Sequence, residues 1–207
     1  MSSERQWWLR IPAVLISPRS VFVALRDDAE AELDARAEPV LALILLAGIA
    51  GVLTTSTAAT LLDDLEFDNL LVAVWALIAG GIYGFAGYFI IGGAVYLAAR
   101  GLGGVGDFRR ARHVVAFAAA PIALSLLLVW PFELAVLGSD VFSSGGSDEG
   151  TSGFVFESLE LAFAMWSLGL LLVGVRAVHD WSWWRSLGVL GLVSLFLAAF
   201  AYLPSVF

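Results

Sequence analysis

Glycines and arginines in the middle of the chain are the first residues that suggest chemistry. Gly101, Gly103 and Gly106 have the spacing G-x-G-x-x-G. A dinucleotide site needs this fingerprint after a strand, because the turn then delivers pyrophosphate to a helix N-terminus. Here apolar segments of membrane-spanning length precede and follow it. We therefore interpret the glycines as a tight connection between two spans, with Asp107 as the cap of the second.

The arginines after this turn are candidate recognition residues. At a membrane surface, arginine pairs with lipid phosphates or with an acidic protein partner. The alternative is that these charges only set topology. The candidate partner- or lipid-contact residues are Asp107, Phe108, Arg109, Arg110 and Arg112.

Catalytic and metal sites are weakly supported. His113 and His179 are expected at the inner ends of two spans, near Asp107 and Asp180. Without a close ligand pair such as H-E-x-x-H, a structural role is favoured over a zinc site. The absence of cysteine excludes thiolate metal sites, disulfides and cysteine nucleophiles. We predict no enzymatic activity, no metal and no cofactor.

Acidic residues leave a second function open. Glu133, Glu157 and Glu160 are expected toward the outer ends of two spans rather than deep in the bilayer. Glu133, Glu160 and a glycine-rich second span would suit a small permease or channel for an unidentified solute. An enzyme acting on lipid head groups through His113 and His179 is the weakest alternative.

Composition identifies the elements that position these residues. The chain of 207 residues is 60% hydrophobic and 14% charged, more apolar than one soluble core could bury. We expect an all-α membrane bundle with a cytoplasmic segment at 1–38 and a membrane domain at 39–207. Its five spans are predicted over 39–62, 70–99, 113–137, 158–179 and 186–206.

The N-terminal segment is predicted to form an amphipathic interfacial helix, with Ser17 as a cap and Pro18 at a first helical position. Packing of this helix on the bundle is an equal alternative. Residues 27–38 are expected to form a solvated helical linker.

Small residues and proline predict how the spans pack. Stripes of small residues occur in span one, at Ala47, Gly51, Thr55 and Ala59, and in span two, at Ala76, Gly80 and Gly84. Span two is favoured as one long helix, and Pro121 predicts a kink in span three. The Gly- and Ser-rich segment 138–153 is expected to be a flexible, solvated connection. Trp181, Trp183 and Trp184 are expected to anchor at the membrane interface.

Arginine placement predicts topology. All eleven arginines lie in the N-terminal 38 residues, the loop after span two and the turn after span four. The positive-inside rule places these segments in the cytoplasm and the C-terminus outside a multi-pass protein of the cell membrane. Nucleic-acid binding is not indicated. Abundant acids without lysine resemble the composition of proteins from extreme halophiles.

Four short motifs occur in order along the chain. They are P-x-x-x-F at Pro18 to Phe22, G-D-F-R-x-A at Gly106 to Ala111, F-x-x-x-P at Phe117 to Pro121, and V-R-x-V-H-x-x-S at Val175 to Ser182. With five spans and a cytoplasmic N-terminus, this pattern resembles the Ypt-interacting-protein (Yip) domain family. Gly106, Pro121, Arg176 and His179 are family-like structural positions.

The resemblance implies a non-enzymatic adaptor or membrane organiser, with lipids and other membrane or membrane-associated proteins as partners. Eukaryotic relatives act in vesicle trafficking and bind small GTPases. This chain lacks their D-L-Y-G-P block, has Phe117 where tyrosine is common, and has a short N-terminal region. These departures argue against binding of a small GTPase.

Overall fold

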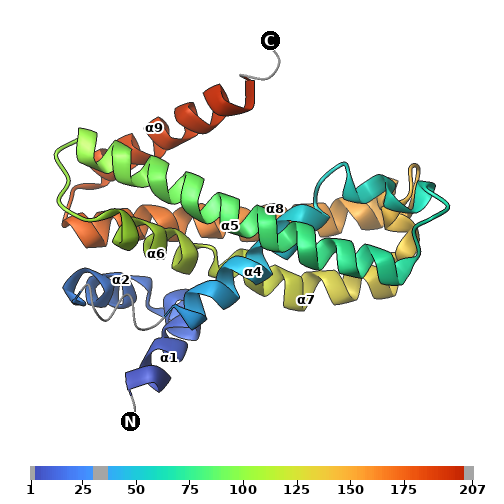
Figure 1. The fold of residues 1–207 in the computed structure, drawn as a ribbon, viewed down its shortest axis with the longest axis horizontal. Coiled ribbons are helices and arrows are strands. Elements are labelled where there is room, and N and C mark those ends of the chain that lie inside the picture. The colour runs from blue at the N-terminus through green and yellow to red at the C-terminus, as the bar shows by residue number, and fades with distance from the viewer. Residues whose placement is uncertain (1–2, 30–36, 203–207) are drawn as a thin grey trace. The chain divides into compact units, whose positions relative to one another are not determined.

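The computed structural model describes residues 3–29 and 37–202, and within those ranges the regular structure is entirely helical, which confirms the all-α prediction. The α-helices are α1 (Ser3–Ile16), α2 (Pro18–Asp27), α4 (Glu38–Leu53), α5 (Asn69–Gly101), α6 (Phe108–Ala118), α7 (Ala120–Leu137), α8 (Thr151–His179) and α9 (Trp183–Tyr202) (Figure 1). Short 3-10 helices occur at η1 (Ala58–Asp63), η2 (Ser139–Phe142) and η3 (Ser147–Glu149). Most of the predicted linker 27–38 lies outside the described residues.

Helix lengths support three membrane crossings. Three apolar stretches are long enough: α5, the combined stretch Phe108–Leu137 of α6 and α7, and α8. The apolar parts of α4 and α9 are shorter. Backbone contacts divide the chain into two compact units. Unit 1 contains residues 1–41, 87–118 and 168–207, and unit 2 contains residues 42–86 and 119–167.

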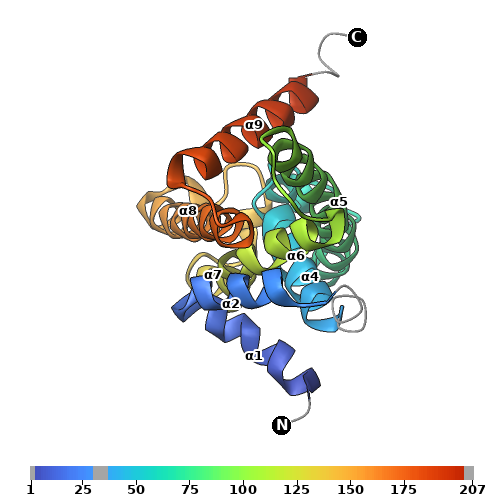
Figure 2. The same ribbon diagram turned by 90° about the vertical axis from the view of Figure 1, so that its left-hand side faces the viewer.

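In unit 1, the N-terminal segment packs against α6 (Figures 1 and 2). Trp7, Phe22 and Leu25 are buried, and Trp7 lies edge-on to His113 with ring centroids 6.2 Å apart. Of the two alternatives for this segment, the structure shows packing on the helices.

The segment forms two helices instead of the expected one. Pro18 occupies a first helical position as predicted, but the Ser17 side chain makes no capping hydrogen bond. Ser17 N–H donates to the Ala13 carbonyl over 2.7 Å, so the residue ends α1 as well as preceding α2. Pro18 has no N–H with which to continue the α1 ladder, which explains the break.

In unit 2, glycines allow α4 and α5 to pack backbone against backbone. A side chain at Gly48 would clash with the Gly80 carbonyl oxygen, and one at Gly84 would clash with the Ile44 carbonyl oxygen. The predicted stripe on α5 is thus confirmed at Gly80 and Gly84. On α4 the closest approach is at Gly48, whereas Gly51 faces the Tyr83 ring. The predicted α4 stripe is thus supported at Gly51, whereas Thr55 and Ala59 lie beyond the end of α4 at Leu53.

The first predicted span ends early as a helix. Residues 39–62 were expected to be continuous, but α4 stops at Leu53. The hydroxyls of Thr54 and Thr55 donate to the carbonyls of Gly51 and Val52 over 2.9 and 2.6 Å. Hydroxyl groups that bond to nearby backbone in this way compete with a continuing helix.

The other helix boundaries agree in part with the predictions. The single-helix prediction for span two is confirmed by α5. The predicted disturbance at Pro121 is confirmed, because α6 and α7 are separated at Ala119 and Pro121 lies in the first turn of α7. A proline there leaves the Phe117 carbonyl without its usual helical donor. The last two helices begin earlier than predicted, at Thr151 and Trp183.

The connection 138–153 is folded, contrary to the expectation of a flexible, solvated loop. Val141 and Phe142 are buried, and the Phe142 ring stacks on Trp130 at an interplanar angle of 2°. Ser144 donates its hydroxyl and its amide to Asp63, over 2.5 and 2.9 Å. These hydrogen bonds, that of the side chain first, hold the pKa of Asp63 below its ordinary value.

We predict that Gly80→Ala destabilises unit 2 by about 1–3 kcal/mol, because overpacking forces the two helices apart. An added Cβ would lie 2.6 Å from the Ile49 Cα. Gly81→Ala is the matched control, since its Cβ would meet only Leu45 Cδ1, at 3.7 Å. Denaturant unfolding in micelles measures both variants. Equal stabilities would contradict the close approach of α4 and α5.

Candidate functional site

The glycine turn between α5 and α6 is shaped by local backbone needs. Gly103 has φ 78°, a conformation that glycine adopts without strain. Gly104 N–H donates to the Ala99 carbonyl over 2.8 Å and closes the end of α5. The fingerprint thus follows a helix rather than a strand. The turn therefore lacks the strand-to-helix geometry of a dinucleotide site.

Asp107 caps α6, as predicted. Its Oδ1 accepts the backbone N–H of Arg110 over 2.6 Å. This is the N-cap bond that satisfies one free amide of the first helical turn. Among the candidate recognition residues, Asp107 therefore has a defined structural role.

Arg110 joins α6 to the N-terminal helices. Its guanidinium lies 3.8 Å from Asp107 Oδ2 and donates to the backbone carbonyl of Asp28 over 3.1 Å. The Asp28 carboxylate accepts both terminal nitrogens of Arg10, over 2.5 and 3.1 Å. Sequence reasoning missed Asp28, because it is one acid in a charged run and nothing local distinguishes it.

Arg112 is surrounded by aromatic rings. Its guanidinium carbon lies 5.0 Å from the Tyr88 ring centroid and 4.6 Å from those of Phe89 and Phe108. Cation–π contact of this kind is most favourable where water is excluded. Phe108 is 37% exposed, so part of the residue stays open to the surroundings. Arg109 also interacts within the structure.

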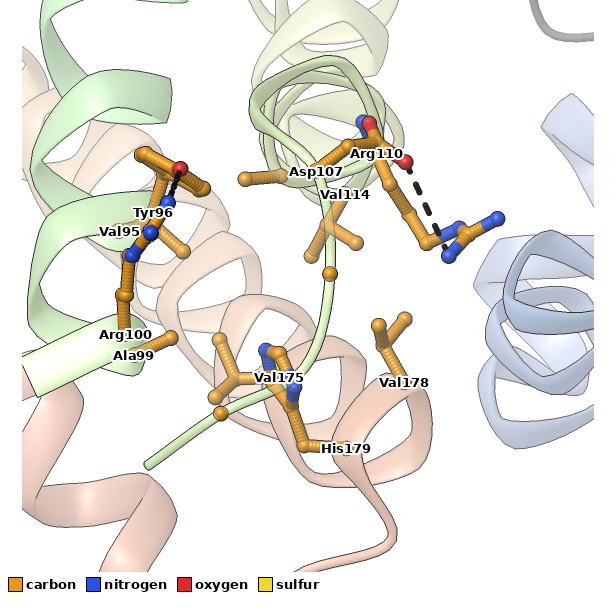
Figure 3. Close-up of a pocket in the computed structure, with 13 residues that line it drawn as sticks. Val95, Tyr96, Ala99, Arg100, Asp107, Arg110, Val114, Val175, Val178 and His179 are labelled. Atoms are coloured by element: carbon orange, nitrogen blue, oxygen red, sulfur yellow. Dashed lines mark hydrogen bonds and ion pairs between the residues drawn. The ribbon is translucent and has the colours of Figure 1, made fainter. Parts of the chain in front are cut away.

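A small cavity lies between α5, α6 and α8 (Figure 3). Its walls are apolar at Val95, Val114 and Val175 and polar at Arg110 and His179. The volume of about 20 Å³ suffices for one water molecule. Among the described residues, Arg110 Nε and His179 Nδ1 are buried and have no hydrogen-bond partner. Water suits this cavity, because it can accept from Arg110 Nε and can also donate to or accept from His179 Nδ1.

The two histidines have different surroundings. His179 lines the cavity with Asp107, whereas His113 contacts Trp7 and Tyr88, and its Nδ1 lies 2.9 Å from the Arg109 carbonyl. The structure thus brings Asp107 and His179 together and leaves His113 elsewhere. Within residues 3–29 and 37–202, no group of three His, Asp or Glu side chains could hold a metal ion.

The turn between α8 and α9 holds the predicted anchoring tryptophans. Trp181 stacks on His179 with centroids 4.5 Å apart, and the Arg185 guanidinium lies 4.1 Å from the Trp181 ring. Arg176 lies 4.5 Å from the Trp183 ring. Trp184 is exposed. The sequence did not reveal these stacks, because the partners meet only once the turn is folded.

Segments far apart in the sequence converge on Gly174. A Cβ at Gly174 would lie 2.7 Å from Val114 Cγ1 and 3.1 Å from Phe22 Cε1. Phe22 and Phe117 are fully buried, and Val175 is almost fully buried. Three of the four motifs thus each contribute a buried apolar residue to unit 1, namely Phe22, Phe117 and Val175. In the fourth motif, Gly106 to Ala111, Phe108 is 37% exposed.

The model of the Yip1 domain matches residues 13–203, which include all four motifs. The chain belongs to the Yip1 domain family. No curated protein and no solved structure matches it. The Yip1 match confirms the resemblance drawn from the motifs, and with the apolar helices it identifies a membrane protein.

We predict that Asp107→Ala lowers stability by about 0.5–2 kcal/mol, through loss of the cap on this Yip1 domain's α6. Asp107→Ser, which retains an acceptor oxygen, should recover most of the loss. Thermal unfolding and hydrogen exchange at the Arg110 amide measure the effect. Unchanged exchange in Asp107→Ala would show that the cap does not hold the first turn.

Proposed function

We propose that this protein is a non-enzymatic, five-span membrane protein that recruits or organises other membrane components through a cytoplasmic, arginine-rich face. The observation that carries the proposal is the charge difference between the two units. Unit 1 contains all eleven arginines and nine acids, and unit 2 contains ten acids without arginine, lysine or histidine. The two units are defined by backbone contacts alone. The difference in their charge is therefore not a consequence of how the units were defined.

The positive-inside rule then gives the orientation. The N-terminus, the glycine turn and the turn between α8 and α9 face the cytoplasm, and the connections 54–68 and 138–150 face outward. At 1.5 Å per residue the 16 residues of α4 rise only ~24 Å against a hydrocarbon core of ~30 Å. We count α4 as a span because it joins an arginine-rich segment to an acidic one. The 54–68 connection is acidic and has no arginine, which suits an outer location.

The N-terminal helices suit the inner membrane interface. Packing on α6 leaves Trp8, Leu9 and Ile16 exposed. These large apolar side chains would enter the headgroup region, with arginines toward lipid phosphates. Interfacial contact and packing on α6 are therefore compatible.

The exposed part of the arginine-rich face suits recognition of an acidic partner. Asp107, Arg110 and Arg112 already have partners within unit 1. Phe108 and Val105 are exposed, and so is Arg100, which donates to the Tyr96 hydroxyl and keeps further donors for outside contacts. A membrane or membrane-associated protein with an acidic surface fits this chemistry. Binding of a small GTPase is not part of the proposal, because the chain departs from the eukaryotic pattern.

A small permease is the second candidate function. It is favoured by a large cavity in unit 2, whose lining includes Glu133 and Glu160. Solute flux into liposomes that depends on these two residues would favour this alternative.

Topology is testable because the native chain contains no cysteine. We expect a membrane-impermeant maleimide added to intact cells to label Leu65→Cys but not Val105→Cys or Asp27→Cys. All three positions are exposed in the structure. Labelling of all three after the membrane is permeabilised is the control. If Leu65→Cys and Asp27→Cys react from the same side, α4 does not cross the membrane.

Recruitment is testable with a photocrosslinking residue at Val105 in native membranes. We expect a defined protein adduct there and none at Leu65 in the acidic 54–68 connection. Arg100→Gln should reduce the adduct about tenfold, because a charge-assisted hydrogen bond contributes about 1.5–3 kcal/mol.

Arg19→Gln is the matched control, since it removes the same charge from an exposed position on α2. The adduct should survive this change. An equal loss in both variants would mean that net charge alone attracts the protein, and the absence of any protein adduct would refute recruitment through this face.

A further inference from the structure

A large acidic cavity occurs within unit 2. It measures about 620 Å³ and is lined by residues from the end of α4, from η1, from α7 and from the segment 138–164. Its acidic lining residues are Glu133, Asp148, Glu157 and Glu160. Because unit 2 has no arginine, lysine or histidine, no basic side chain of that unit compensates these charges.

Two carboxylates of the cavity have acceptor atoms without donors. Glu133 is only 8% exposed, and its Oε2 is buried without a hydrogen-bond partner among the described residues. Glu160 Oε1 is in the same situation. Buried polar atoms are normally hydrogen-bonded, and leaving one unpaired is unfavourable, most of all for a charged group. A bound ligand or water would supply donors to these oxygens, and the Trp130 indole N–H on the same lining is also without a partner among the described residues.

Mutual repulsion adds to this requirement. Glu133, Glu157 and Glu160 line the same cavity. Like charges repel more strongly where water is partly excluded. A bound cation between the carboxylates would remove this repulsion.

The cavity is also aromatic. Trp130, itself buried, stacks on Phe142, and both rings contribute to the lining with Phe154. Aromatic faces attract organic cations, whose apolar parts also gain from contact with the rings. A bare metal ion fits less well, because the described residues include no group of three His, Asp or Glu side chains that could hold one.

We propose that this cavity binds an organic cation that carries N–H donors, of the alkylammonium or diamine class. The N–H groups hydrogen-bond to Glu133 and Glu160, and the alkyl part lies against Trp130 and Phe142. A quaternary ammonium ion is a poor ligand, because it has no N–H for the two unpaired oxygens. This site is separate from the arginine-rich face, which belongs to unit 1.

The test uses putrescine as the probe and the full-length protein in nanodiscs at its native salt concentration. Isothermal titration calorimetry and thermal shift are measured for wild type, Glu133→Gln and Glu160→Gln. Glu66→Gln is the matched control, because it removes the same charge from an exposed residue outside the cavity lining. Tetraethylammonium and an equivalent amount of sodium chloride control for charge without N–H donors.

We expect saturable putrescine binding by wild type and Glu66→Gln, weakened at least about tenfold in each cavity variant, with little response to tetraethylammonium or sodium. Absence of saturable binding to wild type would overturn the proposal. Equal weakening in Glu66→Gln, or equal affinity for tetraethylammonium, would overturn it as well. If one cavity variant does not fold, the other variant still tests the proposal. The comparison of putrescine with tetraethylammonium on the wild-type protein tests it as well.

Discussion

The missing side chain at Gly174 is the constraint on which unit 1 depends. Inside a membrane, apolar surfaces gain little from leaving lipid, so helices associate mainly through close packing. Gly174 permits that packing, since Phe22 of α2 and Val114 of α6 occupy the space where its Cβ would be. With α8 held against these two helices, Val175 and His179 reach the cavity beside Asp107 and Arg110. Residues from three of the four motifs, Phe22, Arg110 and Val175, thus lie at or near the position on α8 that has no side chain.

Polar contacts then fix what apolar packing brings together. Asp28 accepts Arg10 through its carboxylate and Arg110 through its backbone carbonyl, which joins α1, the end of α2 and the start of α6. A partly buried ion pair adds less to stability than the short distance between its charges suggests, because both charges lose contact with water. Its geometry is nevertheless specific, since two nitrogens of one guanidinium bind two oxygens of one carboxylate. We infer that this contact sets the orientation of the N-terminal helices more than it sets their stability.

Features governed by local chemistry could be predicted from the sequence. Asp107 as a cap and the break near Pro121 both depend on a few adjacent residues, and both are confirmed. Features that depend on distant partners could not be predicted. Burial of Trp7 needs α6, and burial of Phe142 in an apparently solvated segment needs Trp130. Nothing in the residues around Trp7 or Phe142 distinguishes them from lipid anchors or loop residues.

Arginine has two roles in this protein that cannot be separated by counting charges. In the orientation that we propose, the positive charges set topology during insertion. Several of them also have partners inside unit 1. Arg112 lies against three rings, Arg185 against Trp181, and Arg176 against Trp183. Guanidinium suits such positions because it is planar and weakly hydrated, so burial beside a ring costs less than it would for lysine. The use of arginine as the only strong base is therefore consistent with this packing. Arginines that pack on rings inside unit 1 offer less of their charge to the surface. The number of arginines in these loops therefore overstates the positive surface that a partner of the proposed kind could contact.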